Sequence, residues 1–370
     1  MEKQKNRRNI KKTDILRTLI FLAILLLVIA YLCNVFTFPK EAERDYVRER
    51  FNSFYAEEKD TLDGVYIGSS GVERYWIPAQ AWNKYGMAVY GLSSGSQPTV
   101  FIKYLMEEAL KSQDPELFII DMRKFSEGAE AVQDLDIRRV TDNMRFSVNR
   151  IQATKAVLDY VKAGGNIEID EEDLSYYIPI MKYHSRWDGD LDADDFVHIN
   201  PGTDYKGYFG YSGKNAWRAI SQPKTSVNTQ YTPMAKENEA VLNDLLDYCD
   251  TIEQEVLFVL SPYSMNTEEQ AVLNSAIRQV EERGYPAINF NTEQMYDTLD
   301  FDFDSDLYNT THTNFAGAMK YTNYLSNYIH DHYKIEDHRG DNMYQSWDES
   351  YEILKERVQK KNPDYYKVFF

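Results

Sequence analysis

Two short segments of the sequence carry residue types from which a hydrolytic site can be built. The first is the Gly-Ser-Ser-Gly segment 68–71, a turn of small residues that can present a serine hydroxyl beside the start of a helix. The second is the segment 306–317, which contains Asp306, Asn309 and His312. A nucleophilic serine needs a base to accept its proton, and the base needs a third group that holds its imidazole in one tautomer. The two segments together predict a serine and histidine site.

The sequence leaves the third group of this site open. Asn309 lies three residues before His312, and Asp306 lies six residues before it. An amide can orient an imidazole, but it stabilises the imidazolium less than a carboxylate does. Each segment alone also fits an ordinary turn or a structural histidine, and it is their order along the chain that favours a site.

Short apolar runs alternate with amphipathic stretches around these segments. We expect strands at 64–68, 87–91, 117–121, 256–260 and 287–290, and helices at 79–85, 99–112, 236–249, 267–283 and 315–333. Apolar strands that alternate with helices are typical of an α/β fold with a parallel sheet covered on both faces. Ligands of such sheets bind at the carboxyl ends of the strands, where the segment 68–71 is expected.

The N-terminus has the pattern of a membrane anchor. Seven Lys and Arg residues precede an apolar run of 18 residues from Leu19 to Phe36, which is too long for a signal peptide core. We expect a cytoplasmic segment 1–14, a transmembrane helix at 15–38, and a C-terminal part outside the cytoplasm. The predicted location is therefore the cell membrane, with a single span.

The remaining chain is expected to form one acidic domain. The first 40 residues carry an excess of six positive charges and the whole chain has a net charge of −18, so the rest carries −24, which argues against binding nucleic acid. We expect a stalk helix at 39–60, an α/β domain at 61–335 with an insertion at about 165–235, and an extension at 336–370 whose aromatic residues could pack a final helix.

Neither a metal nor a cofactor is expected. The alternating aspartates at 188–194 lack the glycine and glutamate that a calcium-binding EF-hand loop would need, and they fit a solvated loop better. His330 and His332 would lie on different faces of a helix. With cysteines only at positions 33 and 249, one of them in the predicted span, no structural disulfide is expected.

The chemistry-bearing segments resemble the SGNH, or GDSL-like, hydrolases and acyltransferases over about residues 60–335. The family places its nucleophile in a Gly-x-Ser turn after the first strand, which corresponds here to Ser70. It places its base in an Asp-x-x-His segment before the last helix, which corresponds to Asn309 through His312. The closest likeness is to the anchored bacterial branch that includes DltD-like and alginate-acetylation-like proteins. The resemblance implies a three-layer sandwich around a central parallel sheet, of the flavodoxin-like type.

The sequence also departs from the family pattern. Position 69 holds serine where the family name has aspartate, and no Gly-x-Asn-Asp segment is evident. The resemblance places oxyanion donors near Ser70 and in the turn 91–95, without fixing which of the residues there contribute. The candidate oxyanion and substrate-binding residues are Ser69, Gly71, Gly91, Ser93, Gly95, Arg123, His184 and Arg186.

The resemblance implies a serine esterase or O-acyltransferase that acts on acyl esters, acetyl esters above all, of an envelope or exported polysaccharide. Its partners would be that polymer and, for transfer, a membrane protein that donates acyl groups. The altered third group and the missing segment leave an alternative, a non-catalytic scaffold or glycan-binding component of envelope polymer assembly with the same fold.

Overall fold

A computed structural model describes residues 11–36, 47–189, 191, 195–196, 205–210, 219–224 and 228–370. Most of the aspartate-rich loop 188–194 lies outside the described residues. So do the last two residues of the expected span, the first part of the expected stalk, and much of the expected insertion.

The centre of the molecule is a sheet of five parallel strands. They are β1 (Gly64–Gly68), β2 (Val89–Ser93), β3 (Leu117–Asp121), β4 (Glu255–Leu260) and β5 (Ala287–Asn289). Their order in the sheet is β2-β1-β3-β4-β5, with all four pairings parallel. The α/β fold with a parallel sheet is therefore confirmed. Because the chain crosses from β2 back to the far side of β1, the switch point of the topology lies between β1 and β3.

The strands form where the apolar runs predicted them, with one shift. β2 begins two residues later than expected, and Ala88, directly before it, bonds to Asp63. The Ala88 N–H donates to the Asp63 carboxylate at 2.6 Å, and the Ala88 carbonyl accepts the Asp63 N–H at 3.0 Å. Strand pairing then starts with Gly64 opposite Val89.

Helices cover both faces of the sheet, each against its own apolar cluster. Val65, Phe118 and Phe258 belong to one cluster, whereas Tyr66, Ile119 and Val259 belong to the other, as the alternation of side chains along a strand requires. The first cluster includes residues of α2 (Val47–Ala56), α5 (Phe101–Ala109), α7 (Val148–Ala163), α10 (Lys236–Cys249) and α11 (Thr267–Glu282). The second includes residues of α3 (Ser70–Glu73), α4 (Pro78–Tyr85), α12 (Glu293–Leu299) and α14 (Phe315–His332).

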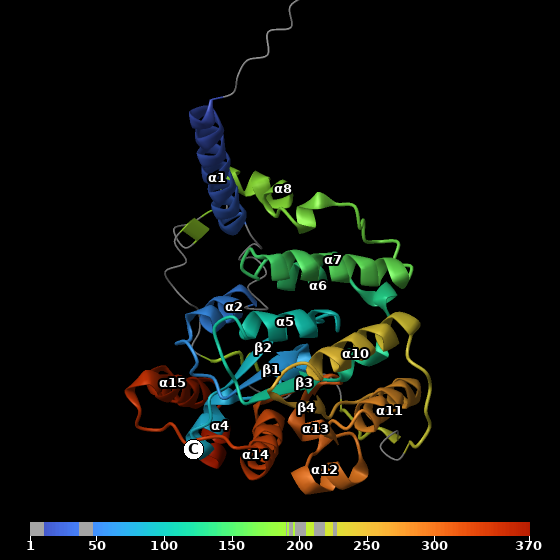
Figure 1. Ribbon diagram of the computed structural model, residues 1–370. Helices are drawn as coiled ribbons and strands as arrows, with labels where there is room; N and C mark the ends of the chain where they lie inside the picture. The colour runs from blue at the N-terminus through green and yellow to red at the C-terminus, as the bar shows by residue number, and fades with distance from the viewer. Residues whose placement is uncertain are drawn as a thin grey trace, which may run out of the picture.

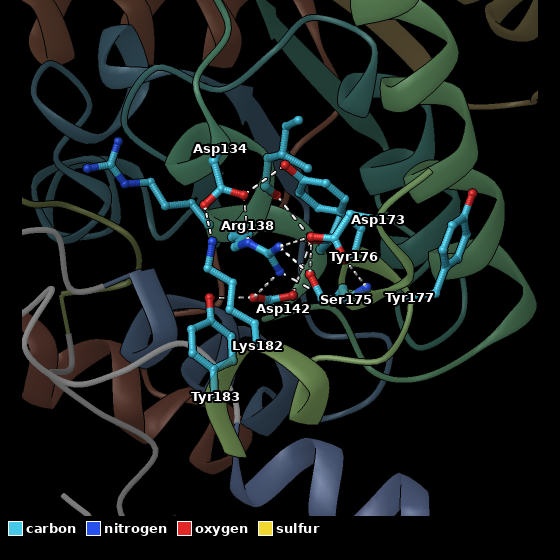
Figure 2. A network of polar contacts seen from close by, with 12 residues as sticks. Asp134, Arg138, Asp142, Asp173, Ser175, Tyr176, Tyr177, Lys182 and Tyr183 are labelled. Carbon is cyan, nitrogen blue, oxygen red and sulfur yellow. Dashed lines mark hydrogen bonds and ion pairs between the residues drawn. The ribbon is translucent and has the colours of Figure 1, made fainter. Parts of the chain in front are cut away.

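A layer of short elements lies beyond α5, on the side of the domain that α1 (Lys12–Val35) approaches (Figure 1). It contains α6 (Asp134–Thr141), α7, η4 (Leu174–Tyr176), α8 (Ile180–Tyr183) and η5 (His184–Asp188). Arg138 of α6 donates to the Ser175 hydroxyl at 2.7 Å, and the Tyr183 hydroxyl donates to the buried Asp142 carboxylate at 2.9 Å (Figure 2). This network fixes η4 and α8 to α6.

The α1 helix is long and apolar enough to cross a membrane. Its stretch of 22 residues from Lys12 to Cys33 contains an apolar part with a mean hydropathy of 2.7. The rest of the protein buries none of that part. The helix begins three residues before the predicted span, because Lys12 through Asp14 continue it toward the N-terminus.

The remaining elements complete the C-terminal half. They are η2 (Arg123–Ser126), η3 (Ala129–Ala131), α13 (Phe303–Asp306), β6 (Leu307–Asn309), β7 (His312–Thr313), η7 (Asn342–Tyr344), α15 (Gln345–Lys361) and α16 (Pro363–Phe369). The expected final helix is α15, and its Trp347 is 1% exposed against Trp82 of α4 at a ring distance of 5.8 Å.

We expect that Trp347→Ala lowers the free energy of unfolding by about 3–5 kcal/mol, because it removes a fully buried aromatic side chain from the contact with α4. Urea unfolding of the full chain in detergent, followed by far-UV circular dichroism, measures the loss. The matched control is Met343→Ala in the same segment, whose side chain is 58% exposed; it should change the value by less than about 0.5 kcal/mol. Equal effects of the two substitutions would contradict the docking of α15.

Candidate functional site

The two serines after β1 have different surroundings. Ser69 is 2% exposed, and its hydroxyl donates to the Asp121 carboxylate at 2.7 Å. Its backbone N–H donates to the same carboxylate oxygen at 3.1 Å. Ser70 is half-buried at the first position of α3, and its hydroxyl has no hydrogen-bond partner among the described residues. Ser69 therefore holds the turn, and Ser70 is the serine whose hydroxyl is available for chemistry.

Two glycines let the turn approach β3 closely. A Cβ atom on Gly68 would lie 2.2 Å from the Asp121 Cβ, and one on Gly71 would lie 2.5 Å from Cδ of Arg123. Neither contact leaves room for a side chain. The Gly-Ser-Ser-Gly sequence thus brings the end of β1 against the end of β3, at the switch point where ligands of doubly wound sheets bind.

Arg123 is a buried cation at this switch point. It is 7% exposed, and its guanidinium carbon lies 4.0 Å from the centre of the Tyr263 ring. Nη2 donates to the Thr311 carbonyl at 2.8 Å, whereas Nη1 is buried and has no hydrogen-bond partner among the described residues. A buried guanidinium with an unused donor is a candidate binder of a carbonyl or an anion.

The hairpin that carries His312 is bonded to the segment that carries Ser70. The Thr313 hydroxyl donates to the Arg74 carbonyl, directly after α3, at 2.5 Å. The Tyr75 hydroxyl donates to the Thr311 carbonyl at 3.0 Å, beside the bond from Arg123. These contacts bring the two predicted segments to the same edge of the sheet, 236 or more residues apart in the sequence.

The imidazole of His312 lies in a cationic environment. Burial lowers its pKa, and the nearby charges of Arg123, Arg74 and Lys124 lower it further, to about 3. The ring is therefore neutral at pH 7 and can accept a proton, but these cations oppose the imidazolium. The Thr311 hydroxyl lies 3.3 Å from its Nδ1.

Both candidates for the third group have other partners. The side-chain amide oxygen of Asn309 accepts the backbone N–H groups of Thr311 and His312, at 3.0 and 2.9 Å, and so closes the β6–β7 turn. The Asp306 carboxylate accepts the Lys320 ammonium at 2.9 Å and the Asp302 N–H at 2.8 Å. In these positions Asn309 acts on the backbone of the hairpin, and Asp306 anchors α13 to α14.

The turn 91–95 contributes fewer oxyanion candidates than expected. The Gly91 N–H donates to the Lys206 carbonyl at 3.0 Å, so it is already used. Ser93 is buried in β2, and its carbonyl accepts a bond from Arg50. The Gly95 N–H has no hydrogen-bond partner among the described residues. Gly95 lies two residues after Ser93, which pairs with Gly68 at the end of β1. The buried Ser93 hydroxyl also has no hydrogen-bond partner among the described residues, so this hydroxyl and the Gly95 N–H are the donors in the turn that remain free.

Two predicted substrate-binding residues lie away from this edge. Arg186 donates to the Val35 carbonyl of α1 at 3.4 Å and to the Asp195 carboxylate at 3.2 Å. The exposed His184 lies beside the Met181 carbonyl in the same layer. Figure 1 shows that α6 and α7 lie between α8 and the sheet, so His184 and Arg186 are not brought together with Ser70.

A polar cavity of about 230 Å³ lies next to the site, and neither Ser70 nor His312 lines it. Lys124, one of the cations that lower the pKa of His312, lines it. The other lining residues come from the β2–α5 loop, η2, η3, α6 and α7: Ser96, Pro98, Thr99, Glu127, Gly128, Ala131, Val132, Gln133, Asp136 and Tyr160. Hydroxyl, amide and charged groups at one wall suit a hydroxylated ligand such as a sugar.

The sequence pointed to Arg123 but missed three other residues of the site. These residues are Asp121, the last residue of β3, Arg74, directly after α3, and Lys124 in η2. Asp121 could have been found, because a carboxylate at the end of an apolar strand is a signal of the switch point. Arg74 and Lys124 could not, because their proximity to His312 depends on the packing of a distant hairpin.

Comparison with protein-family models and with curated proteins gave no match. Within the described residues there is also no group of three or more His, Cys, Asp or Glu side chains that could hold a metal ion.

We expect alanine substitutions of the two serines to differ in their effect on stability. Ser69→Ala should lower the free energy of unfolding by about 1–3 kcal/mol, because the buried Asp121 carboxylate loses a donor. Ser70→Ala should change it by less than about 0.5 kcal/mol, since the hydroxyl has no partner among the described residues. Urea unfolding of the two variants measures the difference, and a larger loss in Ser70→Ala would contradict the assignment.

The environment of His312 should make folding dependent on pH. The pKa is lowered from 6.5 to about 3, so below pH 6.5 the unfolded state binds a proton that the folded state does not, and stability falls as the pH falls toward 3. His312→Gln should reduce this slope by up to about 1.4 kcal/mol per pH unit. Urea unfolding between pH 4 and 7 measures it, with His184→Gln as the control at an exposed histidine. An unchanged slope in His312→Gln would show that the ring is not in this environment.

Proposed function

We propose that this chain is a membrane-anchored serine esterase or O-acyltransferase with an SGNH-type three-layer sandwich. It would act outside the cytoplasm on acyl esters of an envelope or exported polysaccharide. The observation that carries the proposal is the free hydroxyl of Ser70 at the switch point, near the hairpin of His312. Arg74 and Tyr75, directly after α3, and Arg123, after β3, are each hydrogen-bonded to that hairpin.

Ser70 would act as the nucleophile and His312 as the base. The Ser70 oxygen attacks the acyl carbonyl while its proton passes to the neutral imidazole, and the imidazolium then gives that proton to the departing alcohol. The acyl group stays on Ser70 as an ester. Attack by water gives hydrolysis, and attack by a sugar hydroxyl gives transfer, with the incoming proton again taken by His312.

The cations around His312 would serve the oxyanion. A histidine with a pKa of about 3 is a weak base, because a catalytic base works best with a pKa near the operating pH. During the reaction, negative charge would develop on the carbonyl oxygen of the substrate, beside Arg123. That charge would offset the positive charges of Arg123, Arg74 and Lys124, and so would stabilise the His312 imidazolium as it forms. The free Nη1 of Arg123 and the Gly95 N–H are the groups that could donate to that oxygen.

The substrate class follows from the surroundings of the site. The cavity at Lys124 has polar walls that suit the hydroxyl groups of a sugar. The acidic surface disfavours nucleic acid as a substrate. The α1 helix, long and apolar enough to span a bilayer, supports a polymer that is made or exported at the membrane.

One observation favours a second function, a non-catalytic scaffold or glycan-binding component. The two residues predicted to orient the imidazole have other structural roles, since Asn309 closes a turn and Asp306 binds Lys320. A polar cavity beside a cationic edge would serve such a binding component equally well.

Labelling with a fluorophosphonate probe separates the two functions. We expect the full chain in detergent to be labelled, and labelling to fall at least about 100-fold in Ser70→Ala and in His312→Gln, because both the nucleophile and its base are needed. The matched control is Ser275→Ala on α11, which should label as the parent does. The rate should not fall between pH 7.5 and 5, because His312 stays neutral there.

Folded protein that takes no label would refute the esterase proposal and leave the glycan-binding component. Labelling that survives in Ser70→Ala would place the reactive serine elsewhere. Binding of acetylated and deacetylated polysaccharide, measured by calorimetry, would then test the second function.

A further inference from the structure

The end of α1 is buried by the domain. Side chains of α1 are exposed up to Tyr31, at 49%, whereas Cys33 is 6% exposed and Val35 is fully buried. Arg186 of η5 donates to the Val35 carbonyl, and the Tyr31 hydroxyl donates to the Phe196 carbonyl at 3.2 Å. The segment that contains η5 and Phe196 is therefore attached to the last turns of the helix.

Arg150 of α7 lies within electrostatic range of α1. Burial lowers the pKa of Arg150, and Asp142 and the Cys33 thiol partly offset this shift. Figure 1 shows α1 beside α8, with its lower end toward the layer that contains α7.

The length of α1 sets the depth of this contact. A bilayer has a hydrocarbon core of about 30 Å, which a helix crosses in about 20 residues. If the hydrocarbon begins at Ile15, after the charge of Asp14, it ends near Val35. Val35 then lies at the boundary between acyl chains and headgroups, and Tyr31 lies about 6 Å inside it.

Exposed apolar side chains are concentrated in the part of the chain that also contains the contacts with α1. Among the described residues outside α1, 12 large apolar side chains are exposed, and nine of these lie between residues 135 and 196. Five of the nine flank the contacts with α1 and form what we name the apolar face: Phe146, Val148, Met181, Trp187 and Phe196. Trp187 is 74% exposed and Val148 is 72% exposed.

Buried polar contacts hold the apolar face in place. The Asp195 carboxylate, fully buried, pairs with Arg48 of α2 at 2.8 Å and with Arg186 at 3.2 Å. Tyr183, directly before η5, donates to Asp142, within the network shown in Figure 2. Because such paired charges are costly to separate, the apolar side chains are presented on a fixed surface.

We propose that the apolar face lies in the headgroup region of the bilayer that α1 spans, so that the domain rests on the membrane. The proposal rests on the membrane anchor of the proposed function. The occupant is lipid, because the face continues the lipid-exposed surface of α1 at the depth where tryptophan is enriched in membrane proteins. The acidic chain would be repelled by anionic headgroups, so apolar contacts and not charge drive the docking.

Quenching of tryptophan fluorescence by brominated lipid tests the proposal. The full chain is reconstituted in phosphatidylcholine vesicles with or without bromine at shallow acyl positions, and flotation on a density gradient first shows that it is inserted. We expect bromine to quench the fluorescence and Trp187→Phe to remove at least half of that quenching. The matched control is Trp347→Phe, a buried tryptophan on α15, which should leave the quenching unchanged.

The outcomes separate the anchor from the docking. A chain that floats but whose quenching is unaffected by Trp187→Phe overturns the docking alone, and the apolar face would then be left to a protein partner in the membrane. A chain that does not float overturns the anchor and the docking together. If quenching is lost in Trp187→Phe but not in Trp347→Phe, the result would support both the anchor and the docking.

Discussion

The buried carboxylate of Asp121 is the group on which the candidate site depends. It accepts hydrogen bonds from the Ser69 hydroxyl and N–H and from the Arg123 N–H, and so joins the end of β1 to the end of β3. An ionised carboxylate in this position needs those donors, because burial without them would cost several kcal/mol. Two glycines, at 68 and 71, make the approach possible. Ser70 and Arg123 are placed at the switch point as a consequence.

The charged groups near this carboxylate include three cations and a second buried carboxylate, Glu73. Arg123, Arg74 and Lys124 act together on His312, and the fully buried Glu73 pairs with Arg74 at 3.2 Å. The protein has a negative net charge, but these cations lie together at the carboxyl ends of the strands. The local electrostatic potential there can therefore be positive. Such a site is suited to stabilise an oxyanion, and it stabilises an imidazolium only when negative charge is present beside it.

The predictable parts of the molecule were those that depend on local pattern. The apolar runs identified all five strands of the sheet, because strands buried on both faces must be continuously apolar. The Gly-Ser-Ser-Gly turn was recognised from its spacing after the first strand. The roles of Asn309 and Asp306 were not predictable, because either side chain could face the imidazole or the backbone at the same sequence separation. The layer of α6 and α7 was also missed, since α7 has little separation of apolar and polar faces in its sequence.

A buried arginine links α2, the next described helix after α1, to the candidate site. Arg50 of α2 donates to the Ser93 carbonyl at the end of β2 and pairs with Glu73 of α3 at 2.8 Å. The same helix binds the membrane-proximal segment through Arg48 and Asp195. Arg48 and Arg50 lie two residues apart on this helix. The contacts beside α1 and the contacts of the candidate site therefore meet on α2.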